Sequence, residues 1–347
     1  MGTNASLKDF LRYRLRRVIV LNLLLLITLL TTLYFSLALG PVFHEPLFII
    51  KVIEGKELNP TFITILTTQR IPRAISAILV GASLALAGLY FQTITRNPLA
   101  DPYLIGVSSG ALLGVSIAYR LGFTIRNTYE LAMVAFLGSL IGFTMTLAIS
   151  KVTGFHSLSL ILGGLGISFL LNSVSLFILI TSFEFHKVLI MLFGSLTAAS
   201  WDLNYLMILT LLAGTAYGIA MFKGLNALMI SDDEVRSLGY NPNILRFMTS
   251  LFSALMASVT VACFGLIGFI GLAIPHIARL LLKGGNLITL IPTTMLVGAI
   301  TLMVSDLVSR TVLPPHEIPL NTITGLLGSP ILIYLLIKGV RRGLTNY

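Results

Sequence analysis

The sequence has 347 residues, of which 56% are hydrophobic and only 10% are charged, against about 25% charged in soluble domains. A soluble domain of this length could not cover its surface with so few charges, so composition alone indicates an integral membrane protein. The net charge of +10 would suit a nucleic-acid-binding protein, but the basic residues gather at the chain ends and between apolar runs. We therefore expect no nucleic-acid partner and interpret the charge as membrane topology.

Nine long runs without charged residues follow one another along the chain, and about 20 apolar residues cross a lipid bilayer as a helix. The run 247–278 is too long for one crossing and contains Gly265, Gly268 and Pro275, so we expect two helices joined by a bend. The sequence thus predicts an all-α integral membrane protein of about ten spans, with one domain over residues 1–347. The runs are 18–39, 74–95, 102–119, 131–150, 157–183, 203–222, 247–278, 286–305 and 318–337.

The distribution of basic residues predicts the orientation of these spans. An even number of spans places both chain ends on the same side of the membrane, together with most of the 23 lysines and arginines. An excess of basic residues marks the cytoplasmic side. We therefore expect a multi-pass protein of the cell membrane with both termini in the cytoplasm. The terminal clusters are Lys8, Arg12, Arg14, Arg16 and Arg17, and Lys338, Arg341 and Arg342.

A compact turn, RNPLADP, occupies residues 96–102 between the second and third runs. With Arg96, Asn97, Pro98 and Asp101, it resembles the signature of the permeases that carry vitamin B12, haem and iron-siderophore complexes inward in ATP-binding-cassette (ABC) importers. The segment GFIGLAIPHIARLL at 268–281 is similar to that family as well. The resemblance extends from about residue 16 to residue 342.

The resemblance implies a type II importer permease with two inverted halves. In that family two permease subunits work with an ATPase dimer and an extracytoplasmic substrate-binding protein. The lipid bilayer, a second copy of the chain, the ATPase and the binding protein are therefore the expected partners. The chain itself is expected to hold no cofactor, because ATP is used by the ATPase.

Three arginines lie at the expected outer ends of spans. Arg70 and Arg73 precede the second span and Arg310 follows the ninth. From the residues alone, anchoring of the spans at the membrane interface is the favoured interpretation. The resemblance implies that they dock the binding protein, and a guanidinium fork suits a carboxylate partner. Asp306, one helical turn before Arg310, is expected to orient it.

The largest inner segment covers residues 224–242. Ser231 is a candidate N-cap with Glu234 three residues later, as in a capping box, and Gly239 is a candidate helix stop. A plain helix-turn would explain this pattern, whereas the resemblance implies coupling helices that fit a cleft on the ATPase. Val235 stands where the family usually has Ala, which implies a matching change in the ATPase or a slightly different helix angle. The implied coupling residues are Ser231, Asp232, Glu234, Val235, Arg236, Leu238 and Gly239.

Small residues recur at helical spacing, as in Gly106, Gly110 and Gly114, which favours close helix packing. In the resembling family the passage runs between the fifth spans of two subunits. Its inner gate corresponds to the loop before the fifth span, where Ser157 and Leu158 stand.

No motif of catalysis is present in the sequence. It contains no phosphate-binding loop, no catalytic serine or zinc-protease motif, a single cysteine and isolated histidines, so we expect no enzyme activity and no metal site. An ion-gradient-driven transporter is the alternative, but it predicts carboxylates within the spans, and the nine runs contain none.

The expected cargo is an iron-siderophore or a similar chelate such as cobalamin or haem. An oxyanion such as molybdate is the alternative cargo.

Overall fold

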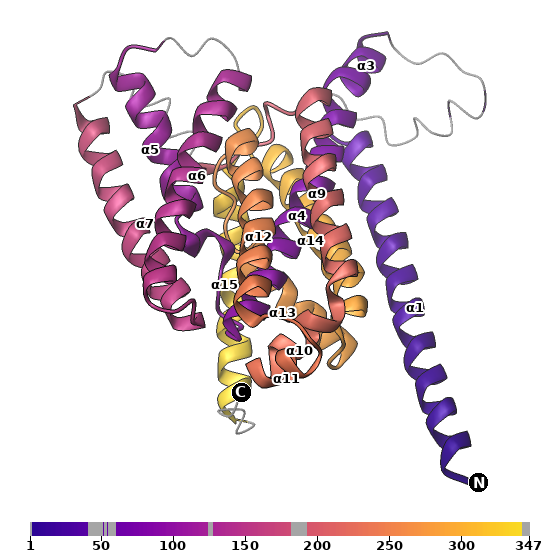
Figure 1. Ribbon diagram of the computed structural model, residues 1–347. Coiled ribbons are helices and arrows are strands. Elements are labelled where there is room, and N and C mark those ends of the chain that lie inside the picture. Colours follow the sequence, from indigo (N-terminus) through magenta and orange to yellow (C-terminus); the bar gives the residue numbers. More distant parts are fainter. Residues whose placement is uncertain are drawn as a thin grey trace.

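The computed structural model describes residues 2–40, 51, 54, 60–123, 128–181 and 193–341, and all regular elements in this part of the chain are helices (Figure 1). The first half contains α1 (Gly2–Ala38), α3 (Pro60–Ile65), the π-helical turn η1 (Leu66–Arg70), α4 (Ile71–Thr95), the 3-10 turn η2 (Pro102–Ile105), α5 (Val107–Arg120), α6 (Thr128–Val152) and α7 (Ser157–Ile180). The second half contains α9 (Trp201–Ala220), α10 (Phe222–Ile230), α11 (Asp232–Ser237), α12 (Pro242–Phe264), α13 (Ile270–Leu282), α14 (Leu287–Thr311) and α15 (Leu320–Arg341).

The expected spans coincide with these helices. Seven of the described helices are long and apolar enough to cross a membrane, whereas α5 and α13 are shorter. The run 247–278 divides into two helices as expected. Its break lies at Gly265, whose φ of 74° ends α12 after Phe264, and α13 starts five residues later. A positive φ favours glycine, which explains why the bend falls there.

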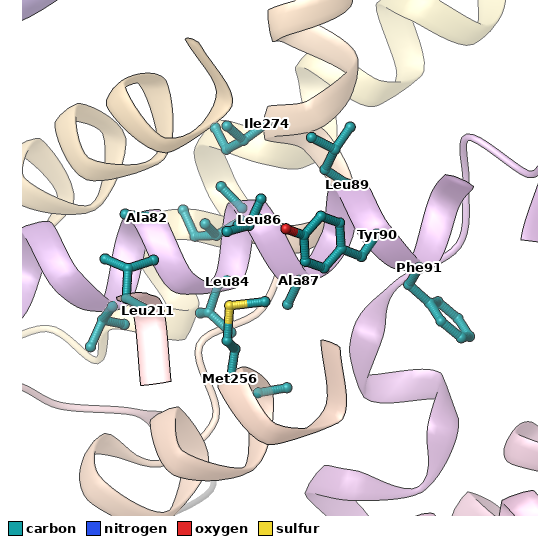
Figure 2. Packing of buried hydrophobic residues seen from close by; sticks show 14 of the residues in the cluster. Ala82, Leu84, Leu86, Ala87, Leu89, Tyr90, Phe91, Leu211, Met256 and Ile274 are labelled. Atoms are coloured by element: carbon teal, nitrogen blue, oxygen red, sulfur yellow. The ribbon is translucent and has the colours of Figure 1, made fainter. Parts of the chain in front are cut away.

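Helix α4 forms the centre of the bundle. Nearly all of its side chains from Ala74 to Thr95 are buried. Figure 2 shows Leu86 and Tyr90 of α4 among Leu211 of α9, Met256 of α12 and Ile274 of α13. Helix α1 is the opposite case, because only 6% of its apolar window is buried inside the chain. Leu23, Leu24 and Leu30 are each more than half exposed. This exposed apolar surface fits a helix that faces lipid.

Glycines let α5 and α6 approach each other at backbone distance. A Cβ atom at Gly110 would overlap the carbonyl oxygen of Gly138, and one at Gly106 would meet that of Gly142. Gly114 meets the same helix one turn further on. The expectation that this glycine stripe serves helix packing is therefore confirmed.

A buried glutamine of α4 compensates for the proline inside α13. Pro275 has no N–H, so the carbonyl of Gly271 loses its helical donor. The side-chain amide of Gln92 donates to the carbonyl oxygens of Leu272 at 2.9 Å and Gly271 at 3.5 Å. Arg279 in turn donates to Gln92 Oε1 at 2.6 Å. These contacts fix the short helix α13 against the central helix.

Candidate functional site

The helices that carry the predicted functional residues end at two opposite ends of the bundle (Figure 1). We call one the α10–α11 end. It also holds the beginning of α1 and the end of α15. The other is the α3 end, where α4 begins and α14 finishes. The predicted docking arginines lie at the α3 end, and the predicted coupling segment lies at the α10–α11 end.

At the α3 end, Arg73 of α4 joins two carboxylates from distant parts of the chain. Its Nε donates to Asp306 Oδ1 of α14 at 2.8 Å. Its two terminal nitrogens donate to the two carboxylate oxygens of Glu317 at 2.7 and 2.8 Å. Asp306 is fully buried, whereas the Glu317 side chain is 30% exposed. Charge-assisted pairs with two bonds are among the strong hydrogen bonds of proteins, so this group fixes α4 to α14.

The other two arginines hold the end of α1. Arg310 donates to the carbonyl oxygen of Ser36 at 2.6 Å and to its hydroxyl at 2.7 Å. Arg70 donates to the carbonyl oxygens of Leu37 at 2.7 Å and Ala38 at 3.1 Å. The last carbonyls of a helix have no partner within the helix and attract cations. Both guanidiniums therefore cap the C-terminus of α1.

The structure thus brings the three predicted docking arginines together and gives each of them partners inside the chain. Asp306 contacts Arg310 Nε at 3.3 Å, as expected from their spacing. Arg70 and Arg310 are only 5% and 4% exposed. Their capping of α1 was missed by sequence reasoning, because nothing in the sequence says which carbonyls a distant arginine reaches.

At the α10–α11 end, the local signals of α11 are confirmed. The Ser231 hydroxyl accepts a hydrogen bond from the Glu234 N–H at 3.1 Å, so it is the N-cap of α11. In a capping box the Glu234 side chain would accept from the Ser231 N–H. Here the Ser231 N–H donates to the carbonyl oxygen of Ala227 instead. Gly239 has a φ of 83° and donates to the carbonyl of Arg236, which ends the helix.

The predicted coupling residues divide between two faces of α11. Glu234, Arg236, Leu238 and Gly239 are exposed, whereas Val235 is fully buried in the core of the chain. The expectation that Val235 matches a change in the ATPase surface therefore needs correction, since its side chain packs inside its own chain. The alternative, a slightly different helix angle, stays a prediction. The exposed side borders a hollow of about 400 Å³ lined by Arg236, Gly239, Tyr240, Asn241, Pro242 and Asn243.

Asp232 also faces the chain rather than solvent alone. Arg246 of α12 donates to its two carboxylate oxygens at 2.6 and 3.0 Å, and Arg96 at the end of α4 forms a second ion pair with it. Arg96 Nε also donates to the carbonyl of Leu228 in α10 at 2.6 Å. The bonds from Arg246 contribute most to lowering the pKa of Asp232; desolvation opposes them and Arg96 adds to them. The carboxylate therefore stays ionised at neutral pH.

The signature turn is shaped by its own polar side chains. Asn97 and Asp101 each accept a hydrogen bond from the backbone N–H two residues later, at 2.9 and 2.8 Å. Such Asx turns explain why Asn and Asp stand at these positions, with Pro98 exposed between them. Burial raises the pKa of Asp101 to about 6. Arg96 begins the turn with a φ of 50°.

The two predicted gate residues lie at the start of α7. Leu158 is 66% exposed. The hydroxyl of Ser157 donates to the carbonyl oxygen of Ile94, in the last turn of α4, at 3.0 Å. Ser157 therefore attaches the α6–α7 loop to α4, a contact that the sequence did not reveal.

Comparison with known proteins identifies the family. Residues 25–338 match the FecCD transport family. The chain belongs to this family. It is 33% identical over 345 residues to an ABC transporter permease protein of Methanocaldococcus jannaschii, covering 95% of this chain and 98% of that protein. It is 35% identical over 325 residues to the haem-iron transport system permease protein IsdF of Staphylococcus aureus, covering 93% and 97% of the two chains.

Solved structures agree with this assignment. An inward-facing metal-chelate type ABC transporter superposes with a TM-score of 0.80 at 30% identity, over 91% of this chain and 98% of that one. PsaBC of Streptococcus pneumoniae superposes with a TM-score of 0.59 at 15% identity, over 82% and 94%, and supports the fold alone. The expected fold class, an all-α membrane permease of the type II importer kind, is confirmed. The protein is a multi-pass membrane subunit of a binding-protein-dependent ABC importer and not an enzyme.

Proposed function

We propose that this permease carries a metal chelate across the cell membrane, with an iron-siderophore complex or haem as the cargo. The observation that carries the proposal is the family match over residues 25–338. Relatives named for haem-iron and metal-chelate transport support the same cargo class. Cobalamin is the next candidate, and an oxyanion is the alternative outside this class.

The ATPase partner is proposed to bind at the α10–α11 end. Three apolar side chains are exposed there, Ile230 at 71%, Leu238 at 50% and Ile244 at 59%. Exposed charges of α11 surround them, including Glu234 and Arg236. Apolar groups with a polar rim are typical of a surface that another protein covers. Because the basic chain termini lie at the same end, we place this end in the cytoplasm.

The substrate-binding protein is proposed to dock at the opposite α3 end, near Arg70, Arg73 and Arg310. Arg70 and Arg310 donate their hydrogen bonds to carbonyl oxygens at the end of α1. Arg73 shares its charge with Glu317, whose carboxylate is partly exposed. An incoming carboxylate would therefore compete with Glu317 for the Arg73 fork.

A second copy of the chain is proposed to face α7, so that the passage runs between the two subunits. The outward side of α7 exposes Leu162, Phe169 and Phe177. It also exposes the polar Asn172, and a Cβ at Gly166 would meet nothing within 4 Å. A polar amide facing lipid tails is unfavourable, which supports a protein or aqueous neighbour on this side. The loop at Ser157 and Leu158 would then narrow the inner end of the passage.

A mild-detergent pull-down of this chain from its native membrane tests the proposal. We expect an ATPase with a phosphate-binding loop and a substrate-binding protein to purify with it. Metal analysis and the absorption spectrum of the binding protein would then distinguish an iron chelate, haem and cobalamin. Purification of the chain with neither partner would contradict the proposal.

A further inference from the structure

The α10–α11 pair is joined to the rest of the bundle by polar contacts at its inner side. Asp232 receives Arg246 of α12 and Arg96 of α4, and the carbonyl of Leu228 receives Arg96 as well. The amide oxygen of Asn226 in α10 accepts from the Leu287 N–H at the start of α14 at 2.8 Å. The pair therefore cannot shift as a unit without moving its neighbours or breaking these bonds.

Arg96 adopts a backbone conformation that local energetics disfavour. Its φ of 50° lies in the left-handed region, where a helix usually ends with glycine. A side chain in this region is disfavoured, because its Cβ atom comes close to the following carbonyl oxygen. In this chain the side chain binds both Asp232 and the carbonyl of Leu228. These contacts to α10 and α11 offset the strain and fix where the guanidinium points.

The same turn of α4 also binds the first residue of α7. The Ser157 hydroxyl donates to the carbonyl of Ile94, one of the last carbonyls of α4, which lack partners within the helix. Ser157 is the first residue of α7, and the exposed Leu158 follows it. Only Thr95 thus separates the attachment of α7, at Ile94, from that of α11, at Arg96.

We infer that the last turn of α4, residues 94–96, is a mechanical relay that links the ATPase-facing helices to the loop at the start of α7. This inference rests on the proposed function, because it requires an ATPase to move α10 and α11. Asp232 and Arg96 are the positioning residues on one side of the relay, and Ser157 is the positioning residue on the other. Since α4 is buried along its length and packed backbone to backbone, its end moves as a rigid element.

Thiol labelling at the gate loop tests the relay. The only cysteine of the chain, Cys263, is buried, so Leu158→Cys introduces an accessible thiol. The variant is assembled with its ATPase in nanodiscs, and its reaction rate with a maleimide is measured with ADP and with a non-hydrolysable ATP analogue. Asp232→Asn and Ser157→Ala are each combined with it. Asp202→Asn is the matched control, because Asp202 lies in the first turn of α9, outside α7, α10 and α11, and accepts a hydrogen bond from Tyr129 at 2.7 Å.

We expect the nucleotide to change the labelling rate in the parent and in the Asp202→Asn control. In the Asp232→Asn and Ser157→Ala backgrounds this change should shrink by about threefold or more, while the ATPase still binds. Ser157→Ala removes a single hydroxyl, so it tests the relay even if Asp232→Asn fails to assemble. An unchanged response in both backgrounds, or a parent that binds ATPase without any response, would overturn the relay alone. A parent that binds no ATPase would overturn the proposed function as well.

Discussion

Arg73 and Glu317 form a two-bonded ion pair that joins the first turn of α4 to the segment before α15, across 244 positions of sequence. The same guanidinium binds the buried Asp306 of α14. Three parts of the chain therefore meet at one side chain. A partner that approaches the α3 end therefore meets an arginine that is already hydrogen-bonded to two carboxylates of its own chain.

The Arg73 network should be important for stability. Arg73→Gln leaves Asp306 buried with Arg310 as its remaining ionic partner, and breaking a buried ion pair costs about 3–5 kcal/mol. Because Glu317 is partly exposed, its share of the pair is weaker. We therefore expect a loss of about 2–3 kcal/mol in the free energy of unfolding in detergent. Arg236→Gln, at an arginine whose side chain is 66% exposed, should change it by less than about 0.5 kcal/mol. Equal effects of the two substitutions would contradict this account.

The end of α1 should loosen when its arginine caps are removed. Arg310→Gln and Arg70→Gln take cations away from the carbonyls of residues 36–38. Because α1 has few buried contacts, we expect faster hydrogen exchange of its last turn, corresponding to about 1–2 kcal/mol per cap. Exchange in α10, at the opposite end of the bundle, provides the internal control. Unchanged exchange at the end of α1 would show that the caps do not hold it.

Two glycines should respond oppositely to alanine. At Gly110 the new methyl group would overlap the backbone of Gly138, so we expect Gly110→Ala to destabilise the protein by about 1–3 kcal/mol. At Gly166 the methyl would meet nothing within 4 Å, so helix propensity alone acts and gives a stabilisation of up to about 1 kcal/mol. Thermal unfolding of both variants in the same detergent checks the prediction. Destabilisation by Gly166→Ala equal to that by Gly110→Ala would argue against the packing.

The contribution of Asp232 to the free energy of unfolding should decrease as the pH falls. Its pKa is lowered in the folded chain, so its ion pairs stabilise fully above the unfolded value, about 3.9, and are lost as pH falls through the lower folded value. Arg246 and Arg96 face it from α12 and α4. The stability difference between the wild type and Asp232→Asn should therefore be constant from pH 8 to about pH 5.5 and shrink below about pH 4. A difference that disappears between pH 7 and pH 6 would contradict the assigned partners.

Much of the fold follows from the sequence because membranes impose simple rules. Run length sets the helices, and the bend between α12 and α13 falls at Gly265, where glycine tolerates a positive φ. The N-cap Ser231 and the stop Gly239 are local signals and were predicted for the same reason. The division of the chain into two inverted halves stays a prediction.

The site was less predictable because its contacts are long-range. The sequence analysis did not single out Arg246, whose partner Asp232 comes from a different helix. Val235 was expected to face the ATPase and lies in the core, because the orientation of a six-residue helix depends on what packs behind it. Gln92 was overlooked for a similar reason. Its role appears only once Pro275 of α13 lies beside it.

The central claim is that ATP, and not an ion gradient, drives a metal chelate through this permease. The most direct measurement is uptake of an iron chelate or haem into proteoliposomes that hold the chain with its ATPase, with the loaded binding protein outside and ATP inside. We expect uptake that requires both ATP and the binding protein and persists when ionophores collapse every ion gradient. Uptake that needs an ion gradient and proceeds without ATP would contradict the account.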